Sequence, residues 1–247
     1  MTAVKVRLAQ GTPCWVSLTT SDHEGAMAFY GALLGWEYGP GPTPLGAYVR
    51  ALSGGAKVAG IGVTPPGTSH SVGWTTYFAV DSADEVTQRV HECGGTVAMG
   101  PLQAERAGRL TIAADLTGSV FGLWQGEEHL GWEVTGEPGA PVWHELLTPD
   151  EPSATAFYQA VFGPVLTPGE DGTTRLLVDG CPVAEIRSTT EGRGWRVHFG
   201  TADCELTARR AEELGGRVVQ EPHDTPQGRM ARLADPQGGR FCVLQVG

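Results

Sequence analysis

Three segments of the first half of this sequence recur in the same order in the second half: 13–36 in 141–164, 73–97 in 194–218 and 108–125 in 228–245. The first pair shares 11 of 24 aligned residues and keeps a tryptophan in the same place, Trp15 and Trp143. This self-similarity indicates that a unit of roughly 120 residues has been duplicated.

The duplication predicts two domains of similar fold instead of one large domain in this chain of 247 residues. We expect the domains at residues 11–127 and 141–247, with a linker at 128–140. The stretch GEPGAP at 136–141 is where we expect the least order, because it is rich in glycine and proline.

Each repeat contains two segments with the pattern of a capped helix. In the first, Ala26, Phe29 and Tyr30 lie on one helical face, Ser21 or Asp22 can cap its start, and Gly35 can end it. Short β-rich runs separate these helices. Each domain therefore consists of two β-α-β-β-β modules, and the fold class is α+β, with four modules whose curved sheets surround cavities and whose helices lie on the outer face.

Composition excludes several classes of protein. The net charge is −11, and the 17 basic residues form no run, so we expect no nucleic acid and no membrane as partner. The N-terminal residues lack the apolar block of a secretory signal, and we expect a cytoplasmic protein. The five cysteines are scattered without a C-x-x-C pair, which argues against disulfides and against a zinc knuckle.

Motifs in both repeats resemble those of the vicinal oxygen chelate superfamily. The pattern D-x6-FY-x4-G begins at Asp22 and at Asp150, GG-x-V follows the second helix, and DP-x-G begins at Asp235. This superfamily contains glyoxalases, extradiol dioxygenases and bleomycin-resistance proteins. Within it, the chain is similar to the tandem two-domain type often labelled hydroxylase.

The resemblance implies where a metal ion would be held, because catalytic members use about four His, Gln or Glu ligands. The matching positions are Trp15, Gly60, Thr75 and Gly122 in the first half and Trp143, Glu185, Arg196 and Cys242 in the second. Only Glu185 and Cys242 could coordinate a cation, and Arg196 would repel one. We therefore expect no metal site and no other cofactor.

Strand alternation places a set of side chains on the cavity faces, and we predict that these bind a ligand: Trp15, Ser17, Trp124, Trp143, Glu145 and Cys242. The two tryptophans either fill the core or stack on a ligand, and Cys242 is a small buried residue or a nucleophile. Alternation directs His144 toward the helix layer. We expect His70 and His198 to be structural or exposed, and Tyr30 and Tyr158 to belong to the core.

Glu185 and Arg196 admit two interpretations. They form a buried ion pair that replaces the structural role of the metal, or they are catalytic. In the second case Glu185 acts as acid or base, and Arg196 stabilises an oxyanion.

Three functions remain open. The first is a metal-independent binder of an aromatic or apolar small molecule, of the sequestration or resistance type. The second is a cofactorless tailoring enzyme, an isomerase, lyase or hydroxylase of secondary metabolism, that uses Glu185 and Arg196. The third is a metal-dependent glyoxalase or dioxygenase. The sequence leaves open whether the protein is a monomer or a homodimer.

Overall fold

The structure is a computed structural model that describes residues 6–42, 46–64, 72–169, 172–190 and 192–247. The first half contains, in chain order, β1 Pro13–Thr20, α1 His23–Leu34, β2 Glu37–Pro40, β3 Tyr48–Ser53, β4 Ala56–Val63, β5 Gly73–Ala79, α2 Ala83–Glu92, β6 Thr96–Ala104, β7 Gly108–Ala114 and β8 Val120–Gly126. The second half contains β9 Pro141–Thr148, α3 Glu151–Phe162, β10 Val165–Pro168, β11 Thr174–Val178, β12 Cys181–Ser188, β13 Gly194–Thr201, α4 Cys204–Glu213, β14 Arg217–Thr225, β15 Gly228–Ala234 and β16 Arg240–Gln245.

Each half forms one mixed sheet of eight strands, and the two sheets have the same topology. The strand orders are β2-β3-β4-β1-β5-β8-β7-β6 and β10-β11-β12-β9-β13-β16-β15-β14. The registers also match: Ser17 lies opposite Gly60 and Thr75, as Glu145 lies opposite Glu185 and Arg196. The predicted α+β fold of four β-α-β-β-β modules is confirmed, and corresponding positions in the halves can be compared directly.

Helix ends follow the local signals in the sequence. Asp22 caps α1 by accepting a hydrogen bond from the Gly25 backbone N–H, and Gly35 ends the helix in the left-handed conformation. In the second half, Asp150 and Gly163 cap α3 in the same way. None of the helices in the described residues is long and apolar enough to span a membrane.

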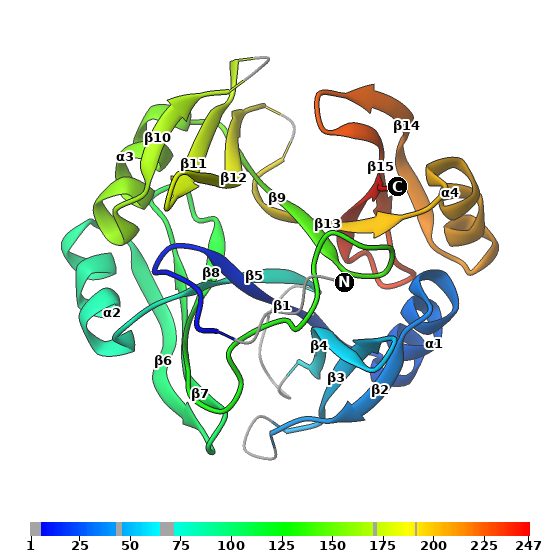
Figure 1. Ribbon diagram of the computed structural model, residues 1–247, viewed down its shortest axis with the longest axis horizontal. Helices are drawn as coiled ribbons and strands as arrows, with labels where there is room; N and C mark the ends of the chain where they lie inside the picture. Colours follow the sequence, from blue (N-terminus) through cyan, green and yellow to red (C-terminus); the bar gives the residue numbers. More distant parts are fainter. Residues whose placement is uncertain (1–5, 43–45, 65–71, 170–171, 191) are drawn as a thin grey trace.

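The two halves interlock through their helices. Helix α1 packs beside α4 and α2 beside α3, so that the helix pairs flank the two sheets on opposite sides (Figure 1). The fully buried Tyr30 of α1 donates a hydrogen bond to Oδ2 of Asp235 at 2.9 Å and accepts one from Nε1 of Trp74 at 2.9 Å. Tyr158 of α3 makes the equivalent contacts with Asp115 and Trp195. Each helix tyrosine thus bonds to a turn of the opposite half.

The linker is packed, contrary to the weak order expected at 136–141. Trp132 is buried and stacks on His144, and its backbone N–H donates to the Cys14 carbonyl at 2.9 Å. The Gly139 carbonyl accepts a 2.7 Å hydrogen bond from Nε1 of the buried Trp36. Aromatic anchors therefore hold this glycine-rich segment to both halves.

Candidate ligand-binding site

The concave face of the first half is filled by its own side chains. Trp15 and Ser17 lie there together, and both donate to the hydroxyl of Tyr48, at 2.9 and 3.4 Å. A Cβ atom built on Gly60 would lie 1.8 Å from this hydroxyl oxygen. The Tyr48 ring therefore occupies the space in front of Gly60, one of the positions that the resemblance assigns to a metal ligand.

The ring of Tyr77 likewise fills space on this concave face, in front of Gly122. It lies opposite Gly122, where a Cβ would come within 2.1 Å of its ring. Trp124 donates to the His129 carbonyl at 2.7 Å, and the edges of both Trp15 and Trp124 meet the His129 ring. The remaining cavity measures about 40 Å³, close to the volume of one water molecule, about 30 Å³. Sequence reasoning missed both tyrosines, although each lies across from a glycine of a neighbouring strand.

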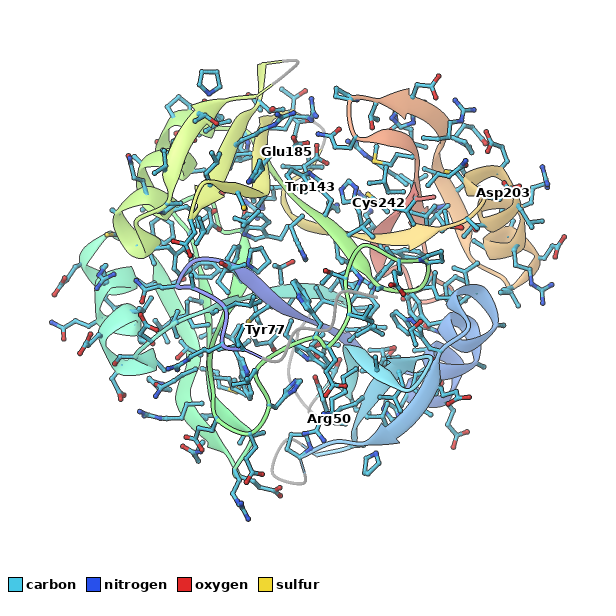
Figure 2. The ribbon with its side chains drawn as sticks, in the orientation of Figure 1. Arg50, Tyr77, Trp143, Glu185, Asp203 and Cys242 are labelled. Carbon is cyan, nitrogen blue, oxygen red and sulfur yellow. The ribbon has the colours of Figure 1, made fainter. Side chains whose placement is uncertain are left out.

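The concave face of the second half is open, and we call it the second-half pocket. Its volume is about 500 Å³, and its lining includes Leu147, Arg196, Arg232, Arg240 and Cys242. The partly buried Trp143 packs against the apolar cluster around Cys242. Figure 2 shows Trp143, Glu185 and Cys242 on this half, with Tyr77 and Arg50 in the other half.

Two buried carboxylates, Glu145 and Glu185, lie side by side on the parallel strands β9 and β12. Arg187 joins them: its Nε donates to Glu145 at 2.6 Å and its Nη2 to Glu185 at 3.3 Å. The expected pairing of Glu185 with Arg196 is wrong, because Arg196 donates to the backbone carbonyls of Trp195 and Arg193 instead. Arg187 lies two residues after Glu185 on the same strand, so both side chains lie on the same face, and strand alternation could have predicted this pairing.

The two carboxyl groups have opposite pKa shifts. Burial, followed by the charge of Glu145, raises the pKa of Glu185 above its ordinary value. Burial also opposes ionisation of Glu145, but the charges of His198, Arg187 and Arg232 outweigh it and lower the Glu145 pKa. Burial raises the pKa of Cys242 to about 12, so this side chain is a neutral thiol at physiological pH.

His198 lies on the cavity-facing side of β13 and is buried, so of the two expected alternatives, structural or exposed, the exposed one is wrong. Its Nε2 lies 4.0 Å from Oε2 of Glu145, and burial lowers its pKa to about 4. His144 has the core position that alternation predicts, stacked on Trp132 with Nδ1 3.3 Å from the Thr76 hydroxyl. His70 lies outside the described residues.

Buried polar atoms without a hydrogen-bond partner concentrate beside the second-half pocket. In the part of the chain that the structure describes there are seven such side-chain atoms, and five belong to this cluster: Trp143 Nε1, Glu145 Oε2, His198 Nδ1, His198 Nε2 and Arg232 Nε. The indole N–H of Trp143 faces Glu185, but not in the geometry of a hydrogen bond. Each unsatisfied buried group costs about 1–3 kcal/mol, and folded proteins keep few of them.

A divalent cation does not fit the donor atoms of either half. The first half presents an indole, a threonine and two glycines shielded by tyrosine rings. Of the four positions that the resemblance assigns to ligands in the second half, Trp143 and the cationic Arg196 cannot coordinate a metal ion and Cys242 is a buried neutral thiol, which leaves Glu185. Across the described ranges, no group of three or more His, Cys, Asp or Glu side chains is arranged to hold a metal.

Comparison with known proteins agrees with this fold. Residues 129–244 match the family model described as a glyoxalase-like domain. The chain is 39% identical over 96% of its length, and 95% of the relative, to a Mycobacterium tuberculosis protein named "Putative glyoxylase CFP32". It is 37% identical over 97% of its length, and 95% of the relative, to the Streptomyces peucetius protein named "Anthracycline biosynthesis protein DnrV".

Solved structures extend the likeness to the two-domain arrangement. The Mn(II)-bound glyoxalase from Novosphingobium aromaticivorans superposes with a TM-score of 0.69 at 16% identity, covering 96% of this chain and 82% of that chain. The 2,3-dioxygenase LapB from Pseudomonas sp. KL28 superposes with a TM-score of 0.66 at 15% identity, covering 98% and 94%. The chain belongs to the glyoxalase-like family of the vicinal oxygen chelate superfamily.

Proposed function

We propose that this protein binds a small organic molecule with a planar aromatic body in the second-half pocket, without a metal ion. The observation that carries the proposal is the set of five unpartnered polar atoms gathered beside a cavity of about 500 Å³. A pocket of this size accepts a drug-sized ligand. A protein that sequesters such a molecule only has to bind it, so this function requires no catalytic residue.

The pocket lining and the relatives both favour an aromatic ligand. Val219 supplies exposed apolar area at the pocket, and the guanidinium groups of Arg196 and Arg232 can stack on an aromatic face. Relatives at 37% identity are named for the biosynthesis of anthracyclines, compounds built on fused rings. The first-half residues Trp15, Ser17 and Trp124 remain predicted ligand contacts that would require the tyrosines to move.

Tryptophan fluorescence tests this proposal, with anthraquinone-2-carboxylate as the probe and EDTA present throughout. Trp143 and Trp15 hold the same place in the two halves, so Trp143→Phe and Trp15→Phe form a matched pair. We expect saturable quenching that weakens strongly in Trp143→Phe and persists in Trp15→Phe. The reverse order, or no saturable quenching by any of a broad panel of quinones and polycyclic phenols, would refute the proposal.

The carboxyl pair supports a second candidate function, a metal-free enzyme that moves protons. Glu145 is held ionised while Glu185 retains its proton to higher pH, and such a division is typical of acid–base sites. The carboxyl pair lies behind the lining of the second-half pocket, beside Arg232, and Arg196 in that lining could stabilise an enolate oxygen.

Deuterium uptake from D₂O tests this second candidate, measured at the carbon beside the carbonyl of 2-tetralone. The enzyme hypothesis predicts uptake faster than in buffer and its loss in Glu185→Gln with binding retained. Uptake equal to that in buffer rejects it.

A further inference from the structure

Three guanidinium groups line the second-half pocket, those of Arg196, Arg232 and Arg240. The duplicated sequence supplies an internal comparison, because the register of the strands is the same in both halves. The corresponding first-half residues are Thr75, Ile112 and Val120, all uncharged. These three charges are therefore a property of this pocket and not of the repeated fold.

Two of these arginines have no carboxylate partner among the described residues: Arg196 donates to backbone carbonyls, and Arg240 makes no hydrogen bond or ion pair there. Arg232 forms one ion pair, with Nη2 3.7 Å from Oε2 of Glu145, and its buried Nε has no hydrogen-bond partner. By contrast, Arg187 binds both pocket carboxylates, and Arg229 on the same strand as Arg232 binds Glu205 and Asp224.

The guanidinium groups also crowd one another. A Cβ built on Gly192 would lie 3.8 Å from Nη2 of Arg196 and 3.9 Å from Nη1 of Arg240, so both groups border the same point. Burial, together with the charges of Arg240 and Arg232, lowers the pKa of Arg196. Arg187 already binds both Glu145 and Glu185, so among the described residues these two carboxylates leave the four arginines around them, Arg187, Arg196, Arg232 and Arg240, with excess positive charge.

We propose that the ligand of the second-half pocket is an organic acid whose carboxylate binds between Arg196 and Arg232, with Arg240 at the entrance. This inference rests on the proposed function and specifies its ligand class. The planar fork of an arginine matches the two oxygens of a carboxylate, and such charge-assisted hydrogen bonds are stronger than neutral ones. Bound in this way, the anion supplies acceptors to Arg232 Nε and relieves repulsion among the three cations.

Titration with a matched pair of probes tests the inference: anthraquinone-2-carboxylate and its primary amide, which differ in charge and little in shape. We expect the carboxylate to bind at least about tenfold more tightly than the amide. Arg196→Gln and Arg232→Gln should each weaken carboxylate binding about 10-fold to 100-fold and leave amide binding nearly unchanged. Arg229→Gln removes the same charge from strand β15 outside the pocket and should change neither affinity.

The exposed Arg240→Gln keeps the test valid if the buried variants fold poorly, because it should weaken carboxylate binding severalfold without affecting the fold. Equal affinities of wild-type protein for carboxylate and amide would overturn the inference and leave the proposed function intact. Binding of neither probe would overturn both. Equal losses for the two probes in the arginine variants would show a structural role and would also overturn the inference.

Discussion

The tyrosine that joins α1 to the opposite half offers a quantitative test of how the two halves are held together. Tyr30→Phe removes one oxygen atom from a fully buried position. That oxygen accepts the indole N–H of Trp74 and donates to Oδ2 of Asp235, both at 2.9 Å. The substitution leaves a buried donor and a buried acceptor without their partner, while the ring packing against Phe241 persists.

The expected destabilisation follows from these two groups. Each buried group left unsatisfied costs about 1–3 kcal/mol, so Tyr30→Phe should lower the free energy of unfolding by about 2–6 kcal/mol. Tyr158→Phe removes the equivalent oxygen from α3 and should cost a similar amount. Urea unfolding, monitored by circular dichroism, measures the free-energy change for both variants, provided that wild type and variants unfold in a single transition.

Tyr38→Phe is the control, because its hydroxyl makes a single 2.8 Å hydrogen bond to the Met27 carbonyl from a partly exposed side chain. We expect a loss of about 1 kcal/mol for that variant. If Tyr30→Phe costs no more than Tyr38→Phe, the tyrosine does not hold the halves together and the reasoning fails.

Two further substitutions test the asymmetry between the halves. Gly122→Ala places a Cβ 2.1 Å from the Tyr77 ring and should destabilise by about 1–3 kcal/mol in thermal unfolding, whereas Gly73→Ala, with nothing within 4 Å, should be nearly neutral. Equal destabilisation by the two alanine substitutions would show that the Tyr77 ring moves away from the new Cβ at no cost. Because the raised pKa of Glu185 makes the folded state hold its proton more tightly, the contribution of Glu185 to the free energy of unfolding should fall as pH rises through that pKa. The stability of wild type relative to Glu185→Gln should therefore decrease over this pH range, and a difference that does not change with pH contradicts the assignment.

The fold was predictable because its signals are local and occur twice. Capping residues such as Asp22 and Asp150, the helical spacing around Phe29 and Phe157, and the glycines that end helices each act over a few residues. Duplication of the pattern then removed ambiguity about the number of domains. Alternation along β9 also placed His144 on the interior side and Glu145 on the cavity side.

The details of the site depend on contacts between distant strands, which local pattern does not specify. Tyr48 fills the first half because a glycine on the next strand leaves room for its ring, and only the register reveals this. Arg187 displaces Arg196 as the partner of Glu185 because it shares a strand with that carboxylate. His198 is buried between Trp143 on β9 and Cys242 on β16, the two strands that pair with β13, and this is a property of the assembled sheet.

The central claim is that one half of a duplicated metal-enzyme fold has become a pocket for an organic ligand, and isothermal titration calorimetry tests it most directly. Anthraquinone-2-carboxylate is titrated into the protein twice, once with EDTA and once after addition of Mn²⁺. The account predicts one ligand per chain and the same affinity in both titrations. Two ligands per chain, or binding that appears only after the metal is added, would contradict it.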